Sequence, residues 1–349
     1  MSRLLTTGMI RKFLKNIFGK SAVNLDQRSI DSYRATLLLK CQEWCSMQPG
    51  KGVQPSQNEV DGFYNDAKSL SEEALIEYNQ KRINHQIIDM FSRVRVEMGP
   101  PSNSGIDESK FEIDGDNDDD DYDNDDDEES AYGLGNRSAT VITRKGSLKE
   151  SVGFELERKE SNITNAGMGV FVKCDSDHTI VAGTVVALFP GLVHLQEFTS
   201  QGDYVVKNLL PDDELMLMAR YDGHIIDGRK AHECAPNPYA LAHLVNHVPK
   251  GEMPNVLQCP YDFPSDPLGL YEFPKRLRKY IPNSYAKRPT TFGTIDRSAF
   301  MHGMVLIAAR PLSRGDELMM DYRLNPKAVQ LPSWYHHFEK EEAEKRWGQ

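Results

Sequence analysis

The chain has 349 residues, of which 39% are hydrophobic and 27% charged, enough for about two domains with a buried core. Its net charge of -11 comes from one tract, because residues 112–129 contain 13 acidic and no basic side chains. The rest of the chain contains 41 basic and 39 acidic residues and is nearly neutral. This near-neutral remainder argues against nucleic acid as a partner. The unpaired spacing of the five cysteines excludes a disulfide scaffold. The sequence contains no apolar run of about 18 residues, so it predicts no membrane-spanning helix.

Residues 1–27 form a basic, amphipathic N-terminal segment that contains no acidic residue before Asp26. Its apolar side chains recur at helical spacing and are Ile10, Phe13, Leu14, Ile17 and Phe18. This pattern is typical of a mitochondrial presequence, but it also fits a membrane-surface helix or a helix docked on the protein. The localisation therefore stays open between mitochondrial and nuclear or cytoplasmic.

Residues 28–98 predict a helical region with several apolar faces. Ser71 followed by Glu72 and Glu73 is typical of a helix start. Cys41 and Cys45 stand four residues apart with no further ligands nearby, so we interpret them as buried helical thiols rather than a metal site.

Residues 99–150 predict an acidic, low-complexity and disordered linker. Gly99-Pro100-Pro101 ends the helical region, and the tract that follows is too charged to fold alone. An EF-hand is excluded because its sixth position is Asp119 instead of Gly. The linker is either a solvated spacer or a docking segment for a basic protein partner, such as a histone.

From residue 151 the sequence changes to short, β-branched segments bounded by Gly, Pro or Asp. The predicted strands are 169–173, 184–191, 224–229 and 304–312. Many short strands with irregular connections indicate a mostly β domain rather than a doubly wound α/β fold.

Three segments of this half carry functional signals. In NAGMGVFV (165–172), Gly167-Met168-Gly169 allows a ligand to approach the backbone, although the pattern lacks the rest of a dinucleotide or P-loop motif. The second is LAHLVNHVPKGEMPNVL (241–257), which contains Asn246-His247 and a later Pro-Asn pair. The third is RPLSRGDELMMDYRLNP (310–326), in which a Gly-Asp turn leads to Tyr322.

His243 and His247 have the spacing of a helical metal site. A zincin requires Glu directly after the first His, where this chain has Leu244, and no third ligand is evident. We therefore predict no metal.

In their order, the three segments resemble the signatures of the SET-domain family of protein methyltransferases, over residues 151–325. Finer features resemble the subgroup named SET domain-containing protein 9, namely ALFPGLV (187–193), DGHIIDG (222–228) and KYIPN (279–283). The resemblance implies a mostly β SET fold, a β-clip with a pseudoknot, preceded here by the helical region and acidic linker and followed by a C-terminal helical tail, 326–349.

The resemblance also implies S-adenosyl-L-methionine as cofactor and a lysine of a protein or peptide as substrate. Gly167, Met168 and Gly169 would line its methionine part, Asn246 and His247 would hold its polar groups, and Tyr322 would stand at the methyl-transfer point.

The chain departs from the family pattern in three places. Six residues separate His247 from Pro254, Met320 replaces an aromatic residue two positions before Tyr322, and no Cys-rich zinc segment follows. Residues 331–347 predict a short helix whose aromatic residues either close the substrate channel or only pack on the domain. The sequence favours a lysine methyltransferase, and the rival hypothesis is a non-catalytic SET module that acts as a protein-interaction scaffold.

Overall fold

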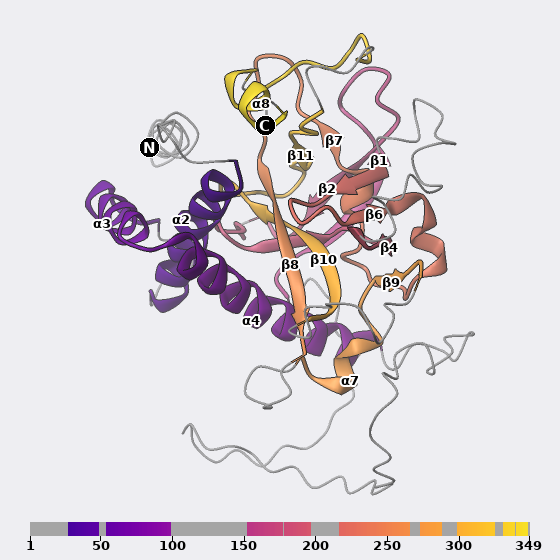
Figure 1. The fold of residues 1–349 in the computed structure, drawn as a ribbon, viewed down its shortest axis with the longest axis horizontal. Helices are drawn as coiled ribbons and strands as arrows, with labels where there is room; N and C mark the ends of the chain where they lie inside the picture. The colour runs from indigo at the N-terminus through magenta and orange to yellow at the C-terminus, as the bar shows by residue number, and fades with distance from the viewer. Residues whose placement is uncertain are drawn as a thin grey trace, which may run out of the picture.

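The computed structural model describes residues 27–48, 54–98, 152–176, 178–196, 216–265, 273–287, 299–324, 331–338 and 340–347. In this part of the chain, N-terminal helices pack against a body of small sheets, which confirms the mostly β fold preceded by helices (Figure 1). Residues 1–26 and 99–150 lie outside the described residues, so the presequence, the disordered linker and its basic partner stay predictions.

The helical region contains three helices: α2 (Gln27–Met47), α3 (Gln57–Lys68) and α4 (Glu72–Met98). Helix α4 begins directly after Ser71, as predicted, and the Ser71 hydroxyl accepts a hydrogen bond from the Ala74 amide at 3.2 Å. Helix α3 was not predicted separately, although Ser56 and Glu59 form a capping box that marks its start. None of the described helices has both the length and the apolar character needed to cross a bilayer.

The body consists of short strands arranged in four small sheets. The strands are β1 (Glu155–Glu160), β2 (Met168–Lys173), β3 (Val185–Leu188), β4 (Gly191–His194), β5 (Leu217–Ala219), β6 (Ile225–Asp227), β7 (Asn246–His247), β8 (Val256–Pro264), β9 (Asn283–Tyr285), β10 (Ala299–Ala308) and β11 (Met319–Met320). The sheets have the orders β1-β2, β3-β10-β8, β11-β7 and β5-β6-β4-β9. Short helices connect them: η3 (Gly228–Glu233), η4 (Ala242–Leu244) and α7 (Lys275–Arg278).

All four predicted strands have somewhat different bounds in the structure, and the strand expected at 184–191 is β3, which already ends at Leu188. The strand expected at 304–312 is β10, which begins earlier, at Ala299, because the whole of its first half pairs with β8. The helix expected over 331–347 is confined to α8 (Lys340–Trp347), and residues 331–338 form turns instead.

Helices and sheets share one hydrophobic core. Phe91 of α4 packs edge-on against Phe273, with ring centroids 5.8 Å apart. Gln86 of α4 bonds to the start of β3, donating to the Gly183 carbonyl at 3.0 Å and accepting from the Val185 amide at 2.8 Å. The β body alone would therefore expose apolar surface, and experiments on the site call for the whole chain.

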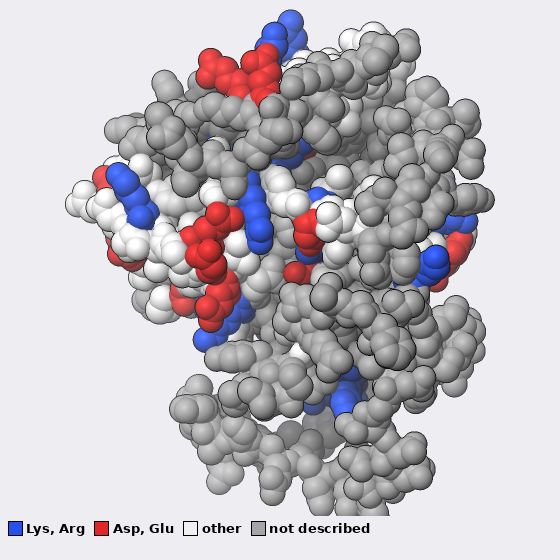
Figure 2. Space-filling model, viewed as in Figure 1, with Lys and Arg blue, Asp and Glu red and all other residues white. Residues whose placement is uncertain are grey.

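On the face shown in Figure 2, the described basic and acidic side chains lie interspersed. This mixture agrees with the near-neutral composition outside the acidic tract.

Candidate functional site

The three sequence motifs lie on neighbouring backbone segments. Strand β2 bonds on one edge to β1 and on the other to the segment before β11, through the Leu318 amide to the Val170 carbonyl at 2.7 Å. Strand β11 then pairs in parallel with β7, so that Met319 faces Asn246 and Met320 faces His247. Segments more than 70 residues apart in the sequence thus meet at one place.

The Asn246 side chain joins these segments. Its Nδ2 donates to the Met168 carbonyl at 3.1 Å and to Glu317 Oε1 at 3.2 Å. Glu317 is buried and also accepts from the Ser161 hydroxyl at 2.6 Å and the Asn162 amide at 2.8 Å. In the sequence, Glu317 is only one residue of the segment that leads to Tyr322, and its burial and three hydrogen-bond donors become visible only in the structure.

The two glycines of the first motif differ in their surroundings. Gly167 has a φ of +73°, and a Cβ added there would meet nothing within 4 Å, so this turn is open. A Cβ on Gly169 would instead collide with the Glu317 carboxylate and lie 3.3 Å from Asn246 Nδ2. Gly169 is therefore required for the close approach of β2 to Glu317 and Asn246.

Asn255, from the second motif, holds β11 in place. Its Nδ2 donates to the Glu317 carbonyl at 2.7 Å, and its Oδ1 accepts from the Met319 amide at 2.7 Å. The side chain is only 3% exposed, so water cannot replace these bonds.

We expect Asn255→Ala to lower the free energy of unfolding by about 2–4 kcal/mol, because it leaves a buried carbonyl and a buried amide without partners. Urea unfolding of the full chain measures this. Asn58→Ala, at an exposed position of α3, is the matched control and should change stability little. Equal stability of the two variants would contradict the assigned role of Asn255.

His247 is a neutral imidazole in this arrangement. Its Nδ1 accepts from the Tyr322 amide at 3.2 Å, while its Nε2 donates to the His336 carbonyl at 2.8 Å. Burial lowers its pKa, and the carboxylate of Asp321, 3.9 Å from Nδ1, opposes that shift only partly. His247 thereby ties Tyr322 to the C-terminal segment.

The Tyr322 hydroxyl donates to the Val245 carbonyl at 3.1 Å. Burial raises its pKa to about 12, so the phenol is protonated at neutral pH. Trp334 packs edge-on against Tyr322, with ring centroids 6.1 Å apart, and remains 52% exposed. Tyr335 stacks on His247 at 4.6 Å. An accessible aromatic ring therefore borders Tyr322 on the solvent side.

His243 has different neighbours from His247. It lies in the single 3-10 turn η4 rather than in an α-helix, so the helical spacing does not bring the two rings together. Its ring packs edge-on against Phe189 at 6.4 Å, and burial lowers its pKa to about 4.

This shift predicts acid sensitivity. The folded-state pKa of His243, about 4, lies below its ordinary value of 6.5, so the unfolded chain takes up the proton first. The contribution of neutral His243 to the free energy of unfolding is complete above pH 6.5 and is lost as the pH falls from 6.5 towards 4. His243→Leu should therefore show a smaller fall in unfolding free energy between pH 7.5 and 4.5 than the wild type. Urea unfolding at both pH values measures this, with the exposed His232→Gln as control; an unchanged fall in His243→Leu would refute the assignment.

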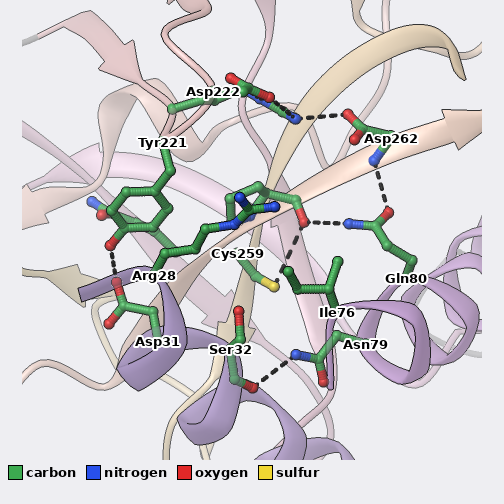
Figure 3. Close-up of a pocket in the computed structure, with 13 residues that line it drawn as sticks. Arg28, Asp31, Ser32, Ile76, Asn79, Gln80, Tyr221, Asp222, Cys259 and Asp262 are labelled. Atoms are coloured by element: carbon green, nitrogen blue, oxygen red, sulfur yellow. Dashed lines mark hydrogen bonds and ion pairs between the residues drawn. The ribbon is translucent and has the colours of Figure 1, made fainter. Parts of the chain in front are cut away.

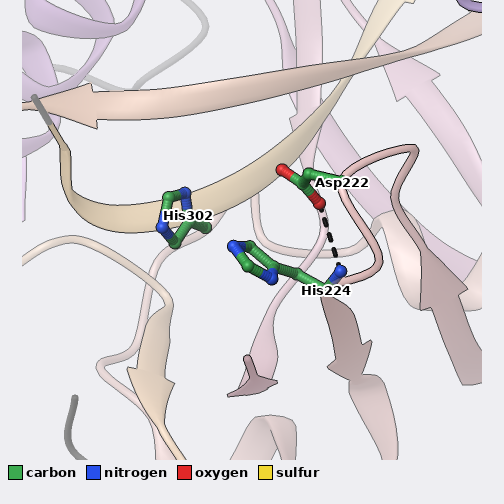
Figure 4. Close-up of side chains that lie close together, drawn as sticks. All are labelled: Asp222, His224 and His302. Atoms are coloured by element: carbon green, nitrogen blue, oxygen red, sulfur yellow. Dashed lines mark hydrogen bonds between the residues drawn. The ribbon is translucent and has the colours of Figure 1, made fainter. Parts of the chain in front are cut away.

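A second group of potential metal ligands, Asp222, His224 and His302, lies on the β5–β6 turn and β10 (Figure 4). Arg220 already binds this carboxylate, with its Nη2 2.6 Å from Asp222 and 2.7 Å from Asp262. Burial alone would raise the pKa of Asp222, but the hydrogen bond and charge of Arg220 lower it to about 2. A guanidinium at this distance repels a second cation, so we interpret the group as a structural ion-pair network.

A cavity of about 90 Å³ lies between α2, α4 and β8 (Figure 3). It is lined by Arg28, Asp31, Ser32, Ile76, Asn79, Gln80, Arg220, Tyr221, Asp222, Gln258, Cys259, Pro260 and Asp262. Cofactor pockets usually measure about 300–1,000 Å³, so this cavity is too small for a nucleoside-containing cofactor.

Two curated proteins resemble this chain, both named SET domain-containing protein 9, from Homo sapiens and Pongo abelii. Each is 25% identical over 207 residues, which cover 50% of this chain and 60% or 66% of the relative. The chain thus spans less than two thirds of the length of these relatives. It matches no protein-family model.

Among solved structures, two crystal structures of KRYPTONITE match at 18% identity and a TM-score of 0.29. One is in complex with mCHG DNA and SAH, the other with mCHH DNA, an H3(1-15) peptide and SAH. They cover 50% and 51% of this chain and 25% of the KRYPTONITE chain. A TM-score this low supports no structural conclusion.

The name of the curated relatives agrees with the motifs, which stand in SET-domain order, and the structure brings those motifs together in a mostly β body. Across half of its length the chain is therefore similar to proteins named SET domain-containing protein 9, in agreement with the family that its motifs resemble.

Proposed function

We propose that this protein is an S-adenosylmethionine-dependent protein methyltransferase that acts on a lysine side chain. The observation that carries the proposal is the Asn246 carboxamide, which bonds both to β2 at Met168 and to Glu317, five residues before Tyr322. The three motifs thereby contact one another, which supports the proposal of one shared site.

The residues present fit the cofactor. The turn at Gly167 is open and Met168 is 39% exposed, so the methionine part of the cofactor could lie against this segment. The Asn246 side chain and the His247 backbone would hold its polar groups. S-adenosylmethionine supplies the methyl group on a sulfonium, so the transfer needs no metal and no covalent enzyme intermediate.

Tyr322 would orient the substrate amine. Its protonated hydroxyl, held by the Val245 carbonyl, is a fixed polar group in a buried position. Aligning two bound reactants can supply ~7–11 kcal/mol of the barrier. Burying an ammonium beside the buried Tyr322 would be costly, so the lysine would lose its proton before transfer.

The substrate class follows from this surface. The exposed Trp334 ring beside Tyr322 could contact the aliphatic part of a long, unbranched amine, such as the lysine that the family resemblance implies. One of the KRYPTONITE crystals contains an H3(1-15) peptide, and we include that peptide among the substrates to be tried.

Calorimetric titration of the full chain with S-adenosylmethionine tests the proposal. We expect the wild type to bind and Asn246→Ala to bind at least tenfold more weakly, because the substitution removes the carboxamide that joins β2 to Glu317. Asn65→Ala, at an exposed position of α3, should bind like the wild type.

Transfer of labelled methyl to lysine peptides then separates the two functional classes. Absence of binding at millimolar cofactor would overturn the proposal. Binding without transfer to any protein or peptide would favour the non-catalytic scaffold.

A further inference from the structure

The residue after Tyr322 is anchored to the N-terminal helical region. Arg323 forms a two-pronged ion pair with Asp31 of α2, with Nη1 2.6 Å from Oδ2 and Nη2 3.1 Å from Oδ1. The side chains of Asp31 and Arg323 are 4% and 14% exposed. A buried bidentate pair has a defined geometry, unlike a surface ion pair.

The same carboxylate also binds the β5–β6 turn. The Tyr221 hydroxyl donates to Asp31, as Figure 3 shows, and Arg323 Nη1 donates to that hydroxyl at 3.2 Å. Arg34, one helical turn further along α2, lies 3.9 Å from Asp31. Asp31 thus connects α2, the β5–β6 turn and the segment that carries Tyr322.

The backbone geometry makes this anchor relevant to Tyr322. Arg323 has a φ of +57°, a left-handed conformation that residues with a Cβ rarely adopt. Its amide donates to Asp321 Oδ1 at 3.0 Å, which fixes the backbone conformation immediately after Tyr322. Asp31 holds the Arg323 side chain on the α2 side, next to the left-handed backbone that directly follows Tyr322.

We propose that Asp31 is a positioning residue for Tyr322 and acts through Arg323, so that the helical region completes the active site. The role in catalysis rests on the proposed function, whereas the effect on the position of Tyr322 does not.

The activity test compares Asp31→Asn with Gln86→Leu in the full chain. Both remove polar links between a helix and the β body, but Gln86 bonds to β3 instead of the Tyr322 segment. Misplacement of a reacting group costs up to about a hundredfold, so we expect kcat of Asp31→Asn to fall about ten- to hundredfold. The KM for the peptide and the Kd for S-adenosylmethionine should stay within about threefold. Gln86→Leu should lower the Tm but leave kcat unchanged when each variant is assayed equally far below its own Tm.

A second readout needs no enzyme activity. 3-Fluorotyrosine placed at position 322 reports its surroundings through its ¹⁹F resonance. We expect Asp31→Asn to shift or broaden this resonance, and Gln86→Leu to leave it in place. If the wild type transfers no methyl group, the proposed function fails while this measurement still decides on positioning.

Arg323→Lys covers the case in which Asp31→Asn does not fold, because it keeps the charge and removes the two-pronged geometry. It should produce the same ¹⁹F change and an intermediate loss of kcat. An unchanged ¹⁹F resonance in the folded variants, or equal effects of Asp31→Asn and Gln86→Leu, would overturn the proposal and reduce the ion pair to a structural contact.

Discussion

Tyr322→Phe should slow methyl transfer at least tenfold while leaving cofactor affinity nearly unchanged. The substitution keeps the ring, and with it the packing against His247 and Trp334, but removes the hydroxyl that bonds to the Val245 carbonyl. Loss of two polar contacts of about 1–1.5 kcal/mol each, one to the protein and one to the amine, accounts for such a factor. Single-turnover transfer to an accepted peptide, alongside a binding titration, measures both quantities.

Tyr239→Phe is the matched control for this experiment. Its hydroxyl also donates to a backbone carbonyl, that of Phe154, at 2.8 Å, but in the hydrophobic core. It should lower the free energy of unfolding by about 1 kcal/mol and leave the transfer rate unchanged. If Tyr322→Phe turns over like the wild type, Tyr322 has no place in the active site.

The sequence predicted the local parts of the fold well. Ser71 and the two acidic residues after it marked the start of α4, and the short β-branched runs located β2, β3 and β6. Such signals come from caps and periodicity within a few residues, which is why they are visible without a structure.

Contacts between distant segments were not predictable in this way. Asp31 and Arg323 are 292 residues apart, and neither has a local pattern that points to the other. Residues 331–338 were expected to be helical, but their aromatic rings pack on His247 and Tyr322 in a turn instead. Tertiary packing overrode local propensity there.

Sequence motifs located the candidate site but not its internal bonds. The order of the motifs pointed to Asn246 and Tyr322. In the structure, Asn246 bonds directly to β2, and Tyr322 follows β11, which pairs with the strand β7 that contains Asn246. Glu317 accepts hydrogen bonds from Ser161, Asn162 and Asn246. These bonds require three distant segments to come together, and no single sequence motif predicts that.

Gly169→Ala should damage both folding and cofactor binding, although it adds only one methyl group. The added Cβ would overlap the Glu317 carboxylate, which is 5% exposed and has little room to move. Displacing Glu317 leaves the Ser161 hydroxyl, the Asn162 amide and Asn246 without their shared acceptor. We expect the free energy of unfolding to fall by about 2–4 kcal/mol and the Kd for S-adenosylmethionine to rise at least tenfold.

Gly62→Ala provides the matched control, because the same methyl group meets nothing within 4 Å on α3. In a helix interior this change should leave stability equal or raise it by up to about 1 kcal/mol. Urea unfolding and calorimetric titration of both variants measure the two effects. The double variant Gly169→Ala with Glu317→Ala makes the test specific: if steric displacement of Glu317 is the cause, adding Gly169→Ala to Glu317→Ala should cost much less than it does in the wild type. An equal cost in both backgrounds would show that the methyl group acts elsewhere on β2.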